Sequence, residues 1–135
     1  MTDERPAVDP ERESVAVALR AASARLAAGS ETPRLDAEVL LRHVLGLDRT
    51  ALFVQMREPL GAADRAAFEA LVERRLAGEP VAYLTGGREF MGLPFAVRPG
   101  VLVPRPETEG LVEWVLGRLV GRLRGTVVDV GTGSG

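Results

Sequence analysis

From Val15 to about residue 85, hydrophobic side chains recur every three or four positions, the spacing that places them on one face of an α-helix, whereas residues 1–8 are interpreted as a loose leader. Asp, Thr or Pro precedes several of these stripes and glycine follows most of them, as is typical of helix ends. We predict helices over 9–29, 33–47, 50–55 and 62–77, and one further turn over 80–84. Short loops and few large aromatic residues then favour a small all-α bundle over residues 1–85.

The pattern changes after residue 85. Two short segments, 88–91 and 94–97, flank Gly92-Leu93 and predict a β-hairpin, so we interpret 86–98 as a hairpin linker. A further helix begins at Pro106 and carries a wide hydrophobic stripe. The β-branched run 126–130 then predicts a central strand of a parallel sheet, buried on both faces. The fold class is α+β, with residues 99–135 as the start of an α/β domain. Without neighbouring strands, we expect residues 126–135 to pack poorly.

Composition narrows the function classes. The 135-residue chain is 46% hydrophobic and 27% charged with a net charge of −2, so it is globular and has no electrostatic case for nucleic acid as its main partner. It lacks cysteine and has one histidine, His43, so we expect no metal site and interpret His43 as a core or boundary residue. No hydrophobic run reaches the roughly 20 residues of a membrane span, and no signal-peptide core is evident, so we expect a cytoplasmic protein.

The strongest candidate chemistry lies in residues 129–135. Gly131, Gly133 and Gly135 allow close backbone approach to a ligand, and backbone N–H groups in such a loop favour a carboxylate or phosphate. Thr132 and Ser134 lie between them. Asp129 precedes the loop and suits a cationic or amine-bearing ligand. S-adenosylmethionine carries a sulfonium, an ammonium and a carboxylate, so it fits both features; the alternative is a purely structural glycine turn.

Three motifs together resemble one family. They are Arg-Glu-Phe-Met-Gly-Leu-Pro-Phe at 88–95, Pro-Gly-Val-Leu-Val-Pro-Arg-Pro-Glu-Thr-Glu at 99–109 and Val-Asp-Val-Gly-Thr-Gly-Ser-Gly at 128–135. The chain resembles the HemK/PrmC family of protein-(glutamine-N5) methyltransferases, which modify peptide chain release factors. The stretches 33–46 and 80–86 are similar to the helical domain of that family. The resemblance implies a release-factor-docking helical domain, a hairpin and a Rossmann-like class I methyltransferase domain.

The resemblance also implies roles for individual residues. Residues 131–135 would cradle S-adenosyl-L-methionine, and Asp129 would hold its amino group. Phe90 would lie near the cofactor and the target glutamine, or else pack the domain junction. For Arg105 and Glu107 the favoured interpretation is structural: they fix the turn and the helix cap beside the site. The catalytic Asn-Pro-Pro-Tyr motif of the family is expected beyond Gly135, and the chain contains no asparagine. We therefore expect residues 1–135 alone to be inactive.

Two alternatives stay open. One is another class I N-methyltransferase, acting on nucleic acid or on a different protein, although the chain has no basic stripe. The other is a non-enzymatic helical binding module. Under the favoured hypothesis the partner is a release factor, neither membrane nor nucleic acid is bound directly, and the intact enzyme is monomeric.

Overall fold

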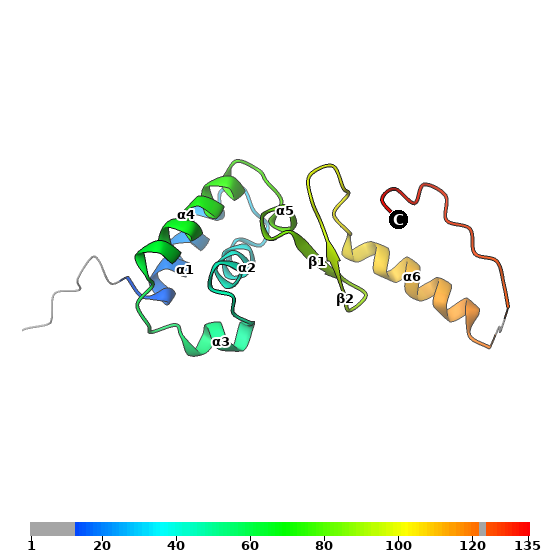
Figure 1. Cartoon of the computed structure of the whole chain (residues 1–135), viewed down its shortest axis with the longest axis horizontal. Helices are drawn as coiled ribbons and strands as arrows, with labels where there is room; N and C mark the ends of the chain where they lie inside the picture. The colour runs from blue at the N-terminus through cyan, green and yellow to red at the C-terminus, as the bar shows by residue number, and fades with distance from the viewer. Residues whose placement is uncertain (1–12, 122–123) are drawn as a thin grey trace, which may run out of the picture. The chain divides into compact units, whose positions relative to one another are not determined.

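The computed structural model describes residues 13–121 and 124–135. Contacts between residues divide the chain into two compact units, Met1–Thr85 and Gly86–Gly135. The described part of the first unit is helical, and the described part of the second contains a two-stranded hairpin followed by one long helix (Figure 1).

The described part of the first unit contains five helices, close to the predicted positions: α1 (Val15–Leu26), α2 (Pro33–Leu45), α3 (Arg49–Val54), α4 (Ala62–Leu76) and α5 (Val81–Thr85). Ser14 caps α1, its hydroxyl accepting the Val17 N–H; the predicted start at Asp9-Pro10 lies outside the described residues. Pro33 opens α2, and Gly46 ends it with a left-handed φ of 64°. The Asp48 carboxylate caps α3 by accepting the Ala51 N–H at 2.7 Å.

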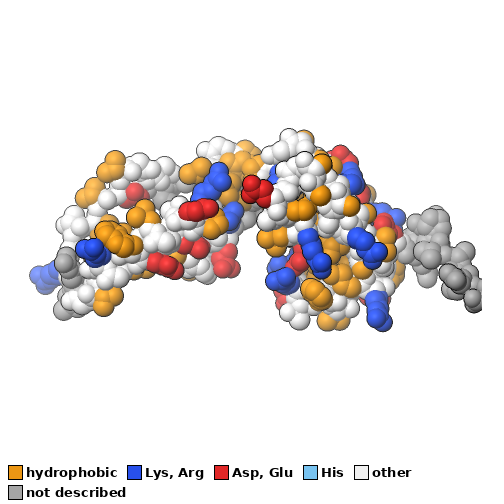
Figure 2. All heavy atoms as spheres, turned by 180° about the vertical axis from the view of Figure 1, so that it is seen from behind, with side chains coloured by type: hydrophobic (Ala, Val, Ile, Leu, Met, Phe, Trp, Pro, Cys, Tyr) orange, Lys and Arg blue, Asp and Glu red, His pale blue; other side chains and the backbone are white. Residues whose placement is uncertain are grey.

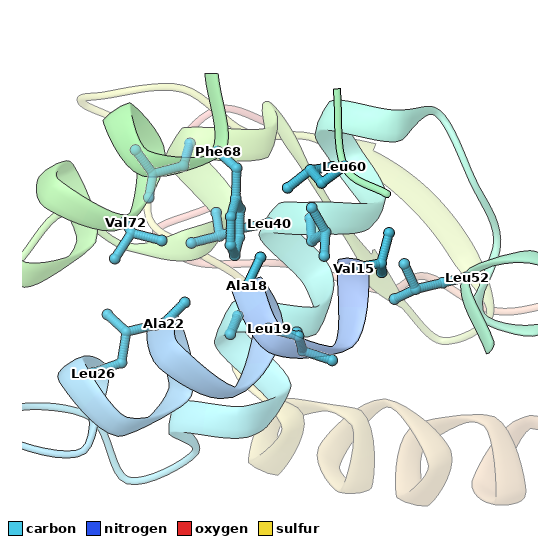
Figure 3. Packing of buried hydrophobic residues seen from close by; sticks show 13 residues of the cluster. Val15, Ala18, Leu19, Ala22, Leu26, Leu40, Leu52, Leu60, Phe68 and Val72 are labelled. Atoms are coloured by element: carbon cyan, nitrogen blue, oxygen red, sulfur yellow. The ribbon is translucent and has the colours of Figure 1, made fainter. Parts of the chain in front are cut away.

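The hydrophobic core lies where α1, α2 and α4 pack on one another (Figure 3). Phe68 of α4 is fully buried and is the only aromatic side chain in the core cluster of the described residues. The aliphatic residues around it come from these three helices, from α3 and α5, and from the segment before α4: Val15, Ala18, Leu19, Ala22, Leu26, Ala37, Leu40, Leu41, Leu52, Leu60, Val72 and Leu84. The predicted helical stripes therefore meet in one cluster, whose burial stabilises the unit.

Asp36 forms a buried polar anchor beside this core. It is 8% exposed, and its carboxylate accepts hydrogen bonds from the hydroxyls of Ser30 (2.8 Å) and Thr32 (3.1 Å). Arg75 of α4 donates to the same carboxylate from Nε at 2.8 Å. One side chain thus joins the α1–α2 loop, the first turn of α2 and the end of α4, and it leaves neither carboxylate oxygen unpaired.

An exposed ion-pair cluster also connects α1 with α4. The guanidinium of Arg25 donates to Glu69 at 2.5 Å and to Glu73. The hydrogen bond that Arg25 donates to Glu69 is the main cause of the raised pKa of the Arg25 guanidinium. Because these groups are solvent-exposed, the cluster contributes little to the stability of the unit.

The second unit begins with strands β1 (Gly87–Phe90) and β2 (Leu93–Ala96), paired antiparallel with Phe90 opposite Leu93. This register makes Met91 and Gly92 the turn residues, one position earlier than predicted. Both have positive φ, 52° and 72°, as a two-residue hairpin turn that follows the strand twist requires. Helix α6 (Pro106–Leu119) begins at the predicted proline.

The predicted strand over 126–130 is absent. Residues 124–130 form no regular structure, and Figure 1 draws them as an irregular trace. Val127, Val128 and Val130 are 66%, 77% and 91% exposed, in line with the expected poor packing. A central strand needs partners on both sides for its N–H and C=O groups, and the described residues contain only the β1–β2 sheet. In the same unit, α6 buries none of its residues fully.

None of the helices in the described part of the chain is both long and apolar enough to cross a membrane.

Replacing Asp36 with asparagine tests the buried anchor. Asp36→Asn removes the charge facing Arg75 and one of the two acceptor oxygens, so we expect the free energy of unfolding to fall by about 2 kcal/mol. Urea denaturation followed by circular dichroism measures this change. Glu58→Gln, the same acid-to-amide change at an exposed position, serves as control and should shift stability by less than about 0.5 kcal/mol. Equal stabilities for the two variants would contradict the anchor.

Candidate functional site

The hairpin turn is fastened to the first turns of α6. The backbone N–H of Met91 donates to Glu109 Oε1 at 2.8 Å. Met91 holds a left-handed φ that side-chain-bearing residues seldom adopt, so this bond helps to keep the turn in place. Glu109 lies in the first turn of α6. Its contact with a residue 18 positions away carries no local sequence signal.

Phe90 lies immediately before this turn and is half-buried. Its ring meets that of Phe95 on β2 edge-on, with centroids 6.0 Å apart and planes at 86°. Because turn and strand pairing are both fixed, the position of the Phe90 ring is fixed too. The predicted site residue therefore belongs to a well-defined hairpin surface.

Arg105 and Glu107 lie at the start of α6, where the helix cap was expected. Arg105 is the N-cap residue, but its side chain makes no capping hydrogen bond; its carbonyl accepts the Thr108 N–H at 3.1 Å. Glu107 lies in the first helical turn, where its charge complements the positive end of the helix. Both residues are exposed.

The glycine-rich loop makes two turns on itself. Gly131, Gly133 and Gly135 have φ of 81°, 68° and 106°, and a Cβ at any of the three would meet no atom within 4 Å. The Thr132 hydroxyl donates to the Asp129 carbonyl at 3.3 Å, and the Gly135 N–H donates to the Thr132 carbonyl at 3.4 Å. All residues from 129 to 135, Ser134 included, are exposed. The backbone conformation is thus one that requires glycine, with open space around it for a ligand.

The Asp129 carboxylate faces solvent and makes no ion pair within 13–121 or 124–135. An accessible carboxylate beside a turn with left-handed glycines offers an acceptor for an ammonium group and backbone donors for a carboxylate. This combination of one acceptor and several backbone donors fits the amino-acid end of S-adenosylmethionine. The loop contacts are internal and the hairpin contacts run to α6, so neither set links Asp129 to Phe90.

His43 is exposed on α2, where it borders a shallow pocket with Arg42 and Thr85. The core alternative for His43 is therefore wrong, because the residue lies at the polar edge of its helix. Across the described ranges, no three His, Asp or Glu side chains gather as metal ligands would.

By its fold, the chain is a small all-helical domain followed in the sequence by a unit with a β-hairpin and one helix. The family described as the PrmC N-terminal domain matches residues 17–86, more than half of the chain. The chain belongs to this family.

Three relatives illustrate the similarity. The "Release factor glutamine methyltransferase" of Burkholderia pseudomallei is 53% identical over 115 residues, 85% of this chain and 40% of that protein. The proteins of the same name from Bordetella pertussis and Coxiella burnetii are 54% and 46% identical over 76% and 90% of this chain. The chain spans about two fifths of the length of these curated relatives, 40%, 38% and 44% respectively.

The Glu109 contact can be tested with a matched pair of variants. Glu109→Ala removes the acceptor of the Met91 N–H, so we expect hydrogen exchange at Met91 and neighbouring hairpin amides to accelerate about fivefold. Glu107→Ala removes the same charge two residues earlier without touching the hairpin and should leave those rates unchanged. Exchange followed by NMR distinguishes the two; equal acceleration would mean that helix charge, not the contact, holds the turn.

Proposed function

We propose that this chain is the amino-terminal part of an enzyme that methylates the side-chain amide nitrogen of a glutamine in a peptide chain release factor. The main support for this proposal is the 53% identity over 115 residues to a protein named for this activity. Since the helical unit has only 85 residues, the match extends into Gly86–Gly135. The similarity therefore spans both the helical unit and residues of the candidate site.

In this proposal, residues 86–98 link the helical domain to a Rossmann-like methyltransferase domain that starts within 99–135. The exposed valines at 127, 128 and 130 support it, because a β-branched run of this kind is suited to a strand buried between neighbours. The helical unit docks the release factor. We expect the intact enzyme to act as a cytoplasmic monomer and on protein, not on nucleic acid.

The cofactor of the proposed reaction is S-adenosylmethionine, which supplies a methyl group activated by its sulfonium. Asp129 accepts from the ammonium of the bound cofactor, directly or through water. The glycine turns over 131–135 bring backbone N–H groups to its carboxylate and ribose end. The left-handed φ values and the open space at Gly131 and Gly133 support this assignment.

The reacting amide nitrogen is a poor nucleophile because its lone pair is delocalised into the carbonyl. Catalysis then depends on aligning the nitrogen with the methyl carbon and on hydrogen bonds that polarise the amide. In this chain, Phe90 contributes an apolar wall near the target glutamine, held by Phe95 and the Glu109-anchored turn. The amide-holding Asn-Pro-Pro-Tyr motif of the family is not among residues 1–135, which contain no asparagine.

A chimaera tests the proposal. Residues 1–135 replace the matching part of the Burkholderia pseudomallei relative, and the product is incubated with S-adenosylmethionine and a release factor. We expect one glutamine of the release factor to gain the mass of one methyl group, while residues 1–135 alone transfer none. Methylation of DNA in place of the release factor by a folded chimaera would contradict the proposal, as would robust transfer by residues 1–135 alone.

The role of Asp129 can be tested in the same chimaera. Asp129→Asn removes the charge that holds the ammonium, so we expect the KM for S-adenosylmethionine to rise between about tenfold and a hundredfold. Glu113→Gln, an exposed acid on α6, is the matched control and should leave the KM unchanged. Equal KM values for both variants would contradict the placement of Asp129 in the cofactor site.

A further inference from the structure

Two arginines without acidic partners lie at one pocket of the helical unit. The pocket has a volume of about 260 Å³ and is lined by Ala16, Leu19, Arg20, Ser23, Arg34 and Met56. Arg20 comes from α1 and Arg34 from the start of α2, so two separate helices bring the charges together. Among the described residues, the lining includes no Asp or Glu. We call this surface the arginine pocket.

The arginines of this pocket differ from most others of the unit. Five arginines of the helical unit, Arg25, Arg49, Arg65, Arg74 and Arg75, form ion pairs with carboxylates. Over the ranges that the structure describes, Arg20 and Arg34 form none, and both are exposed. Two guanidinium groups thus keep their hydrogen-bonding capacity free at one concave place.

The positive charge of Arg34 interacts unfavourably with the dipole of its own helix. It is the second residue of α2, where the positive end of the helix disfavours a cation. Asp36 lies in the same helical turn, and Glu31 and Glu38 line a neighbouring pocket with Arg34, but within the described ranges no acid forms an ion pair with Arg34. A residue that breaks a local rule without an intramolecular gain points to an external partner.

The other lining residues indicate what kind of partner fits. Leu19 and Met56 provide apolar surface, and methionine adapts its shape to different side chains. The Ser23 hydroxyl is already used, donating to the Leu19 carbonyl at 2.8 Å. A pocket of about 260 Å³ accommodates one or two side chains, not a whole cofactor. Figure 2 shows arginine and hydrophobic side chains interspersed over one face of the helical unit.

We infer that the arginine pocket binds an acidic segment of a protein partner, in which a carboxylate meets Arg20 and Arg34 while a neighbouring apolar side chain lies on Leu19 and Met56. The guanidinium groups suit the planar carboxylate through paired hydrogen bonds. A phosphodiester backbone would use the charges but not the apolar floor, and the chain's net charge of −2 gives nucleic acid no long-range attraction. This inference concerns the 135-residue chain and does not depend on the proposed methyl transfer.

Titration of the chain with two short peptides, followed by NMR of the backbone amides, tests the inference. The probes are acetylated and amidated Leu-Glu-Ala-Glu-Leu and its glutamine analogue, Leu-Gln-Ala-Gln-Leu. We expect the acidic probe to shift the amides of Ala16, Leu19, Ser23 and Met56 and to bind roughly tenfold more tightly than the analogue. Equal binding of both probes, or shifts confined to other residues, would overturn the inference.

Arginine variants and a parallel titration with an oligonucleotide complete the experiment. The double variant Arg20→Gln, Arg34→Gln should weaken binding of the acidic probe roughly tenfold. Arg98→Gln, an exposed arginine of the other unit, is the matched control and should bind like the parent chain. Because Arg34→Gln removes a charge that opposes its helix, the single variant should keep the parent stability while losing affinity. Tighter binding of a ten-nucleotide oligouridylate than of the acidic probe at the same residues would also overturn the inference.

Discussion

The helical unit depends on the burial of Phe68 against α1 and α2. This ring is fully buried where three helices meet, and a buried side chain of this size contributes about 2 to 3 kcal/mol. Once α1, α2 and α4 are packed around it, Arg75 lies beside Asp36, and Arg20 and Arg34 come to line one pocket. The polar anchor and the arginine pocket are therefore both consequences of one apolar cluster.

The helices were predictable because their signals are local. Pro33, Asp48 and Gly46 act on residues within one turn, so their positions in the sequence mark helix ends directly. The partner of Asp36 was not predictable, since Arg75 lies 39 positions away and only the packed core brings the two together. The turn at Met91-Gly92 was placed one residue late, because methionine is not a typical residue at positive φ and the Glu109 contact is long-range.

In the candidate site, too, local features were predictable from the sequence and long-range ones were not. The left-handed conformations of Gly131 and Gly133 follow from their residue type, because glycine adopts positive φ without steric cost. The strand before the loop did not form, because β-branched residues favour a strand only where neighbouring strands pair with them. Asp129 and Phe90 consequently stay unlinked in the described residues. In the proposed function, Val127, Val128 and Val130 would be buried by further strands beside them, whereas here they are exposed.

The central claim is that the helical unit packs on its own whereas residues 126–130 form no strand. Hydrogen exchange of the monomeric 135-residue chain, measured amide by amide, tests this claim most directly. The account predicts slow exchange at Leu40 and Phe68, which lie in packed helices, and exchange close to that of an unstructured peptide at Val127, Val128 and Val130. Strong protection of Val128 and Val130 in the monomer would contradict it, because the strand would then form without further partners.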